Sequence, residues 1–207
     1  MPAALVSVIG PPASGKTCLA SHLAQVLPAQ LVREDFAGNP FLSEAYLGRA
    51  DLALPSQLFF LFSRVRQLSL RHWPAGGVVV TDYGFCQDGA YAEQVLNADD
   101  LATYRRLAAP AGGAVKPPDL VVCLDGSEAL LLERIARRGR RHERVFTARF
   151  LSAMREAYRR LSAGLGCRVL TIDIDRDDLF VPEVMARWVE QVRACLQDGP
   201  PRTDPSE

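Results

Sequence analysis

The sequence reads Val6-Ser7-Val8-Ile9-Gly10-Pro11-Pro12-Ala13-Ser14-Gly15-Lys16-Thr17 near its start, an apolar run followed by the pattern G-x-x-x-x-G-K-[ST]. Residues 18–24 continue as a helical segment. Strand, glycine-rich turn and helix in this order are typical of a loop whose backbone N–H groups surround phosphates, with the helix N-terminus favouring the negative charge. The alternative is a chance glycine-rich turn between a strand and a helix. We expect residues 10–17 to bind a nucleoside triphosphate.

Two side chains of this loop and one distant carboxylate have separate expected roles. Lys16 is placed to reach the β- and γ-phosphate oxygens, and the Thr17 hydroxyl is placed to ligate Mg²⁺. Asp82 ends the apolar run 78–81, the position of the second Mg²⁺-site acid in phosphate-loop proteins. Asp82 could instead cap the helix that follows it. The sequence therefore predicts a site for ATP and Mg²⁺, with Thr17 and Asp82 as metal ligands.

The composition is that of an ordinary enzyme. The 207 residues fit one α/β domain, and 24 basic residues balance 24 acidic ones, so no overall positive field indicates a nucleic acid partner. The five cysteines form no C-x-x-C pair, which favours reduced thiols in a cytoplasm. The first strand leaves no room for a signal peptide, and no apolar run approaches membrane-spanning length. We expect a cytoplasmic protein without a membrane partner.

Short apolar runs alternate with helical segments along the rest of the chain. Strands are expected at 6–9, 30–33, 78–81, 120–124 and 168–172, and helices at about 15–27, 41–49, 52–73, 86–97, 99–109, 128–138, 145–163 and from 182 onward. Apolar strands separated by helices indicate a parallel sheet covered on both faces. The prediction is a three-layer α/β/α fold of phosphate-loop kinase type with a five-stranded parallel sheet. Residues 1–197 are expected to form a single domain, and residues 198–207 a disordered tail.

An arginine-rich segment lies near 134–144. Arg134 and Arg138 are four residues apart and share one helical face, while Gly139 can end the helix and let Arg140 move. Planar cationic donors suit the charge of a phosphoryl group in transfer, so this segment is predicted to close over it as a lid. The alternative is a solvated basic face. A small-molecule kinase is the class that these features favour.

Further patterns occur in order along the chain. They are Glu34-Asp35-Phe36-Ala37-Gly38-Asn39-Pro40-Phe41-Leu42, Tyr46, Gln57 and Arg64 seven apart, Asp88 six after Asp82, Pro118-Asp119-Leu120, and R-x-x-x-R-G-R-x-x-E over Arg134, Arg138, Gly139, Arg140 and Glu143. Together they resemble the deoxynucleoside kinase family over most of the chain. Each pattern alone is weakly specific, but their joint order and spacing are strongly so.

The resemblance implies roles for the acceptor-binding residues. Glu34 falls on the carboxylate that acts as base toward the sugar 5′-hydroxyl. Gln57 and Arg64 fall on the nucleobase pocket, and Asp88 on the acid that pairs with that arginine and the base edge. Tyr46 and Glu143 fall on the pair that binds the sugar 3′-hydroxyl.

The resemblance also implies the reaction, which is transfer of the γ-phosphoryl group of MgATP to the 5′-hydroxyl of a deoxynucleoside. Lys16, Arg138 and Arg140 would neutralise the moving charge. The residues expected to bind ATP are Gly10, Pro11, Pro12, Ala13, Ser14, Gly15, Lys16, Thr17, Arg134 and Arg138. By analogy the acceptor is a purine, deoxyguanosine or deoxyadenosine, in purine salvage, and the enzyme is a homodimer.

Two residues depart from the family pattern. Tyr83 follows Asp82 where the family usually has an arginine that steadies the catalytic carboxylate, so Arg64 or the arginine-rich segment would have to supply that charge. Asp35 follows Glu34 where the family has proline, and a neighbouring carboxylate tends to raise the proton affinity of Glu34. The first departure puts the efficiency of catalysis in question.

Other functions remain open at this point. A nucleoside monophosphate kinase shares the fold, but it would leave Tyr46, Gln57 and Glu143 without an obvious role. A kinase for another small hydroxyl compound is a second alternative. A catalytically weakened nucleotide-binding regulator is a third alternative. It is motivated by Tyr83 and by Gly89, which stands where a similar subgroup of the family has an arginine, and it is opposed by the presence of Glu34 and Lys16.

Overall fold

The fold is built around one parallel sheet. The computed structural model describes residues 1–140, 143 and 145–198. Within this part the sheet has five parallel strands in the order β2-β3-β1-β4-β5. The strands are β1 (Ala4–Ile9), β2 (Gln30–Val32), β3 (Val78–Thr81), β4 (Leu120–Asp125) and β5 (Arg168–Asp173). The predicted three-layer fold with a five-stranded parallel sheet is confirmed.

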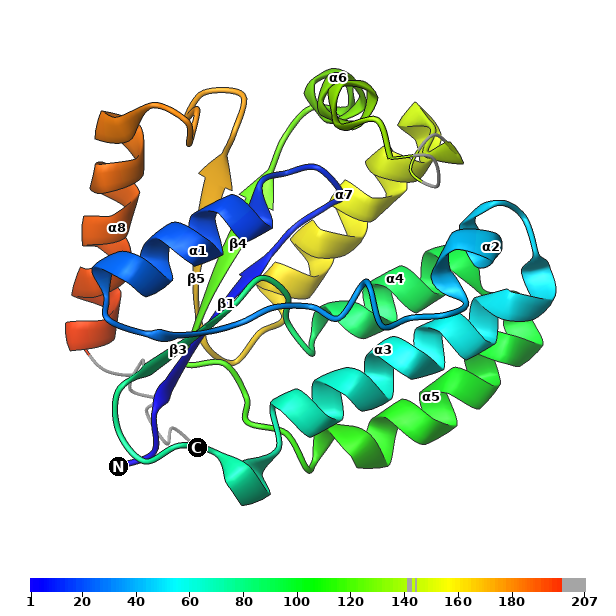
Figure 1. Cartoon of the computed structure of the whole chain (residues 1–207), viewed down its shortest axis with the longest axis horizontal. Coiled ribbons are helices and arrows are strands. Elements are labelled where there is room, and N and C mark those ends of the chain that lie inside the picture. Colours follow the sequence, from blue (N-terminus) through cyan, green and yellow to red (C-terminus); the bar gives the residue numbers. More distant parts are fainter. Residues whose placement is uncertain (141–142, 144, 199–207) are drawn as a thin grey trace, which may run out of the picture.

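Helices connect the strands, in most cases where the sequence predicts them (Figure 1). They are α1 (Lys16–Val26), α2 (Leu42–Tyr46), α3 (Ala53–Gln67), α4 (Gln87–Val95), α5 (Ala98–Gly112), α6 (Glu128–Arg138), α7 (Ala148–Ala163) and α8 (Pro182–Gln197), with 3₁₀ turns η1 (Ala50–Leu52) and η2 (Leu70–His72). The side chains of Ser127 and Thr147 accept hydrogen bonds from backbone N–H groups in the first turns of α6 and α7, which fixes both starts.

Several helices differ from the expected bounds, and three of these differences have a local cause. The helix expected over 41–49 ends at Tyr46, because Gly48 takes a left-handed conformation with φ +102°. The helix expected over 52–73 ends at Gln67, since Ser69 turns extended and pairs with Val115. Conversely, α5 continues through Pro110 to Gly112, and a proline in a last turn costs few helical hydrogen bonds.

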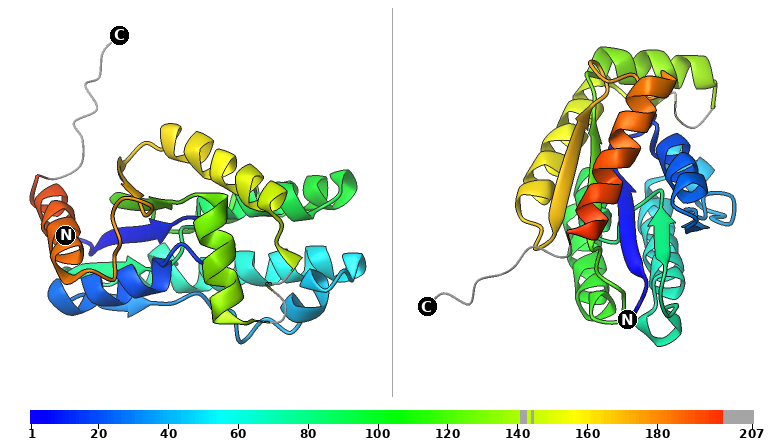
Figure 2. Two further views of the ribbon diagram at one scale, coloured as in Figure 1. Left: turned by 90° about the horizontal axis from the view of Figure 1, so that it is seen from above. Right: turned by 90° about the vertical axis from the view of Figure 1, so that its left-hand side faces the viewer.

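Both faces of the sheet are covered (Figure 2). Side chains alternate along β1, so Val6 and Val8 pack with α1 and α8, while Leu5 and Ile9 belong to clusters on the opposite face. One of those clusters includes the end of α3, and the other includes α7. Helices α3, α4 and α5 lie side by side at one end of the sheet (Figure 1). Because the strands are parallel, their carboxyl ends share one edge, where ligands bind in such folds.

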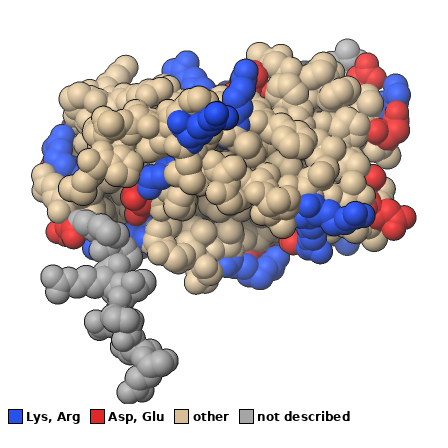
Figure 3. Space-filling view, turned by 90° about the horizontal axis from the view of Figure 1, so that it is seen from below, with Lys and Arg blue, Asp and Glu red and all other residues tan. Residues whose placement is uncertain are grey.

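On the face drawn in Figure 3, basic and acidic side chains are interspersed rather than gathered by sign. The five cysteines are free, as the sequence predicts. Among the described helices none is long and apolar enough to cross a membrane. Of the tail predicted to be disordered, residues 199–207 lie outside the described part. Asp198 is the C-cap residue of α8 and forms an ion pair with Arg168.

Candidate active site

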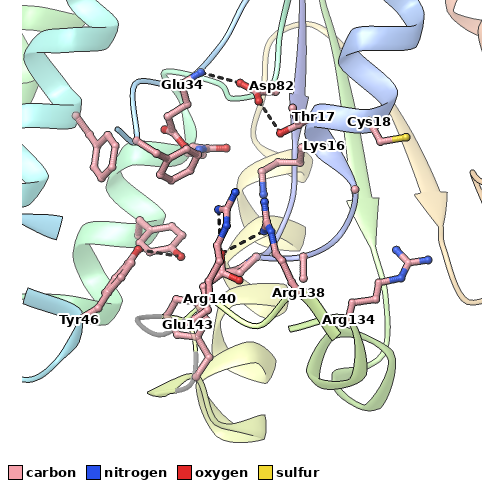
Figure 4. A pocket seen from close by; sticks show the side chains of 18 of the residues that line it. Lys16, Thr17, Cys18, Glu34, Tyr46, Asp82, Arg134, Arg138, Arg140 and Glu143 are labelled. Carbon is pink, nitrogen blue, oxygen red and sulfur yellow. Dashed lines mark hydrogen bonds and ion pairs between the residues drawn. The ribbon is translucent and has the colours of Figure 1, made fainter. Parts of the chain in front are cut away.

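A cavity of about 400 Å³ opens at the carboxyl edge of the sheet (Figure 4). Its wall combines the phosphate loop, the segment after β2, helices α3 and α4, and the region from α6 to α7. These segments are far apart in the sequence, and the sheet brings them together. The cavity therefore contains both the predicted triphosphate site and the predicted acceptor site.

The phosphate loop has the conformation that its glycines allow. Gly10 has φ +144°, and a Cβ there would lie 2.6 Å from the Leu124 carbonyl oxygen, so no other residue fits. The Lys16 Nζ donates hydrogen bonds to the carbonyl oxygens of Gly10 and Pro11, both at 2.9 Å. Burial lowers the pKa of Lys16 to about 8, although the nearby Asp82 opposes this shift. Of the loop residues predicted to bind ATP, the cavity wall includes Pro12, Ala13, Gly15, Lys16 and Thr17. It does not include Gly10, Pro11 or Ser14.

Asp82 connects the phosphate loop to the segment after β2. Its Oδ2 accepts a hydrogen bond from the Thr17 hydroxyl at 2.7 Å, and its Oδ1 accepts one from the Glu34 backbone N–H at 2.8 Å. The carboxylate is buried, which raises the pKa of Asp82. The alternative that Asp82 caps the following helix is wrong, because Cys86 occupies the N-cap position of α4. A hydroxyl and a carboxylate side by side are hard oxygen donors that suit Mg²⁺.

Arg64 lies between two carboxylates in the floor of the cavity. Its guanidinium forms ion pairs with Glu34 and with Asp88, and all three side chains are more than nine-tenths buried. The sequence predicts the pair with Asp88, and it gives the pair with Glu34 as one of two alternatives, since either Arg64 or the arginine-rich segment would have to supply the charge beside Glu34. Because Glu34 and Asp88 share one cation, the cluster of Arg64, Glu34 and Asp88 carries one net negative charge. We call these three residues the Arg64 cluster.

Two aromatic rings fix the position of Arg64. Its guanidinium carbon lies 5.3 Å from the centre of the Phe60 ring and 5.4 Å from that of the Tyr83 ring. The Tyr83 hydroxyl donates to the side-chain oxygen of Gln67 at 2.6 Å. Tyr83 is therefore a buried support for Arg64 rather than a cavity residue, and Arg64 supplies the cation beside Glu34.

Asp88 requires a correction to the predicted acceptor pocket. Gln57 and Arg64 line the cavity beside Glu34, as expected. Asp88 is 4% exposed and is absent from the cavity wall, so it reaches the cavity only through Arg64. Asp88 therefore acts on a ligand indirectly, because its carboxylate orients the guanidinium of Arg64, which lines the cavity.

Tyr46, Glu143 and two arginines form the opposite wall (Figure 4). The Glu143 carboxylate accepts hydrogen bonds from Arg138 and Arg140, each at 3.2 Å. The Tyr46 hydroxyl lies 3.5 Å from that of Tyr91. Burial raises the pKa of Tyr46 to about 12, so its hydroxyl stays protonated and can donate a hydrogen bond. Residues 141, 142 and 144 of the predicted lid lie outside the described part.

Arg134 and Asp35 take positions that the sequence only partly predicts. Arg134 points away from Arg138 and Arg140, and its NH1 donates to the Ser14 carbonyl oxygen at 3.3 Å (Figure 4). Its guanidinium carbon lies 5.7 Å from the centre of the Phe180 ring, which also lines the cavity. The Asp35 carboxylate accepts a hydrogen bond from the Gly38 N–H at 2.9 Å. Asp35 therefore stabilises a local turn of its own segment.

The sequence gives little indication of the remaining wall. The lining residues to which the sequence assigns no role include Gln87, Tyr91, Phe146, Tyr158 and Phe180. These residues come from α4, from α7 and the segment before it, and from the segment before α8. Their positions follow from tertiary packing, and no local pattern could have identified them. Cys18, Phe36 and Arg137 also line the cavity, and their proximity in the sequence to Thr17, Glu34 and Arg138 could have indicated them.

A parallel sheet, a phosphate loop and a part-buried hydrogen bond between Thr17 and Asp82 at its edge are the features of a phosphate-loop nucleotide-binding protein. The comparison with known proteins then gives the family. A sequence model described as deoxynucleoside kinase matches residues 6–197. The chain belongs to the deoxynucleoside kinase family. This match favours the predicted deoxynucleoside kinase over a nucleoside monophosphate kinase.

Individual relatives agree with this assignment. The chain is 27% identical over 187 residues to deoxyguanosine kinase of Bacillus subtilis, covering 86% of this chain and 90% of the relative. It is also 27% identical over 205 residues to deoxyadenosine kinase of Dictyostelium discoideum, covering 95% and 83%. The fold resembles that of M. mycoides deoxyadenosine kinase with bound dATP, with a TM-score of 0.78 at 16% identity, covering 92% and 99%.

Proposed function

We propose that this enzyme transfers the γ-phosphoryl group of ATP to the 5′-hydroxyl of a purine deoxynucleoside, deoxyguanosine or deoxyadenosine. One observation carries the proposal. The hydrogen bond from the Glu34 N–H to Asp82 places a carboxylate that lines the cavity next to the phosphate loop. A base and a triphosphate site in one cavity are what in-line transfer to a hydroxyl requires. The names of the bacterial and amoebal relatives support a purine acceptor.

The acceptor fits the half of the cavity around the Arg64 cluster. Glu34 would accept the proton of the 5′-hydroxyl, with Arg64 holding its carboxylate in position. Gln57 and Arg64 would contact the nucleobase. The Tyr46 hydroxyl and the Glu143 carboxylate would contact the sugar 3′-hydroxyl.

The donor fits the half of the cavity around the phosphate loop. Lys16 would exchange its bonds with the loop carbonyls for phosphate oxygens, and Arg138 and Arg140 would stabilise the charge of the transferred group. Arg134 and the Phe180 ring lie where the rest of the nucleotide would extend. Thr17 and Asp82 would hold Mg²⁺, which supplies positive charge to the β- and γ-phosphates when bound.

A panel assay tests this function. Phosphorylation would be measured with ATP and Mg²⁺ against the four deoxynucleosides, the ribonucleosides and the nucleoside monophosphates. We expect the highest kcat/KM with deoxyguanosine or deoxyadenosine and no turnover of monophosphates. Turnover of monophosphates alone, or of none of these acceptors, would refute the proposal.

We also propose properties of the enzyme as a whole. Residues 1–197 would act as one domain, in agreement with the family match over 6–197. The enzyme would be a cytoplasmic homodimer of purine salvage. Sedimentation equilibrium would measure the dimer, and a mass of 22.7 kDa at micromolar concentration would refute it.

ATP binding is expected to weaken as the pH rises above about 8. Burial lowers the pKa of Lys16 to about 8, so this amine is increasingly neutral above that pH in the free enzyme. Bound phosphate stabilises the charged amine, so binding takes up a proton, and Kd rises by up to about tenfold per pH unit. Calorimetric titration in buffers of different ionisation enthalpy measures both effects. The Lys16→Arg variant, which stays charged, should lose this dependence; equal dependence in both proteins would contradict the assignment.

A 2′,3′-dideoxynucleoside is expected to be a poor acceptor. Without a 3′-hydroxyl, the proposed hydrogen bonds of Tyr46 and Glu143 with the sugar are lost, which lowers kcat/KM by about tenfold to a hundredfold. Tyr46→Phe should reduce this preference, while Tyr104→Phe, a buried tyrosine of α5 outside the cavity, should retain it. Equal use of the deoxy and dideoxy acceptors by the unmodified enzyme would contradict the assignment.

A further inference from the structure

Gln87 is a buried polar residue of the cavity to which neither the family patterns nor the proposed reaction gives a role. It is the first residue of α4, it is 3% exposed, and it lines the cavity. Its Oε1 has no hydrogen-bond partner among the described residues. Buried side-chain oxygens are nearly always hydrogen-bonded in folded proteins. An acceptor left without a partner in a cavity wall indicates that the ligand supplies the donor.

The surroundings of Gln87 disfavour an anion and favour a ligand that donates hydrogen bonds. Arg64 and Gln57 line the same cavity and are 5% and 6% exposed. Asp88, the neighbour of Gln87 in α4, pairs with Arg64, and Glu34 pairs with the same guanidinium. The positive charge of Arg64 is therefore already compensated, so Arg64 itself does not attract an anion to this part of the cavity. Two carboxamides beside a compensated guanidinium suit a flat neutral group with both donors and acceptors on its edge.

The cavity that Gln87 lines is large enough for a nucleobase. Its wall near Arg64 includes the Phe60 ring. An aromatic ring beside carboxamides is a common arrangement for binding a heterocycle. A carboxamide can present a donor and an acceptor side by side, which matches an amino group next to a ring nitrogen.

We propose that Gln87 is a specificity-determining residue whose Oε1 accepts a hydrogen bond from the exocyclic amino group of the acceptor base. This inference rests on the proposed function, because it names what recognises the base of that acceptor. A site built to bind an amino group discriminates against analogues without it, since the buried oxygen then stays without a partner.

The test compares bases with and without the amino group. kcat and KM would be measured for deoxyadenosine against purine 2′-deoxyriboside, and for deoxyguanosine against deoxyinosine. For the better of the two amino-bearing bases, we expect the unmodified enzyme to prefer it over its analogue by about tenfold to a hundredfold. Gln87→Met, which keeps the length of the side chain, should lower kcat/KM for that base by the same factor. The same variant should change kcat/KM for the analogue by less than about threefold.

Two further measurements keep the test decisive. Gln94→Met, on the same helix but outside the cavity wall, is the matched control and should leave both substrates unchanged. If Gln87→Met does not fold, the preference of the unmodified enzyme still decides, because equal use of a base and its analogue overturns the inference. An equal loss for both substrates in Gln87→Met also overturns it. Failure of the proposed function is a separate result, namely an unmodified enzyme that phosphorylates no deoxynucleoside.

Discussion

Replacing Glu34 with glutamine is expected to lower kcat by about 10²–10⁴-fold, because the 5′-hydroxyl then has no carboxylate to accept its proton. The protein should still fold. The substitution keeps the size of the side chain, and the Arg64 cluster becomes a neutral Arg64–Asp88 pair instead of a net negative group. ATP should still bind, since its predicted contacts come from the phosphate loop and the arginines. Steady-state turnover with saturating acceptor and calorimetric binding of ATP measure the two properties.

The control for this prediction is Glu44→Gln. Glu44 lies on α2, is exposed, and forms a surface ion pair with Arg49. We expect its kcat to stay within about twofold of the unmodified enzyme, because an exposed ion pair contributes little. A Glu34→Gln enzyme that keeps kcat within about threefold would remove Glu34 from the proposed mechanism.

The sequence predicts the parts of the site that depend on local chain geometry. The phosphate loop binds its own Lys16 through neighbouring carbonyl groups, and the glycine requirement at Gly10 follows from a close approach to Leu124. The position of Asp82 beside Thr17 follows from the parallel pairing of β1 and β3. Each of these features is set by a short segment or by one strand pair, so a pattern in the sequence is sufficient to predict it.

The parts that the sequence does not predict depend on packing between distant helices. The pairing of Glu34 with Arg64, rather than with an arginine of the lid, depends on the contacts of the Arg64 guanidinium with the Tyr83 and Phe60 rings. In the sequence, Tyr83 is notable only because it occupies the position where the family usually has an arginine. In the structure it supports another arginine beside the same carboxylate. The exclusion of Asp88 from the cavity wall has the same origin, since α3 and α4 pack together and Asp88 of α4 pairs with Arg64 of α3, which lines the cavity.

The pairing of Arg64 with both carboxylates decides which substitution in the Arg64 cluster lowers the stability most. If Asp88 were the only partner of Arg64, Asp88→Ala would leave a buried cation uncompensated. In the structure Glu34 remains beside Arg64 after that substitution, so the buried charges of the Arg64 cluster then balance. Removal of Arg64 is the more damaging change, because it leaves two buried carboxylates with no cation between them.

Arg64→Met is therefore expected to lower the free energy of unfolding by about 3–5 kcal/mol, and Asp88→Ala by less. The double variant Arg64→Met/Asp88→Leu should be more stable than Arg64→Met alone, since one of the two unpaired carboxylates is gone. It should stay below the unmodified protein, because Glu34 is still buried without its cation. Base preference should be lost in every variant that lacks Arg64.

Urea unfolding at pH 7 measures these differences as shifts of the midpoint at constant m-value. Glu93→Ala is the surface control: Glu93 forms an ion pair with Arg105 in which both side chains are exposed, and its loss should cost less than about 1 kcal/mol. A loss for Arg64→Met no larger than for Glu93→Ala would show that the Arg64 cluster is hydrated rather than buried. A larger loss for Asp88→Ala than for Arg64→Met would show instead that Glu34 does not compensate Arg64. Glu34 would then be free of the guanidinium, and its orientation toward the 5′-hydroxyl would need another source.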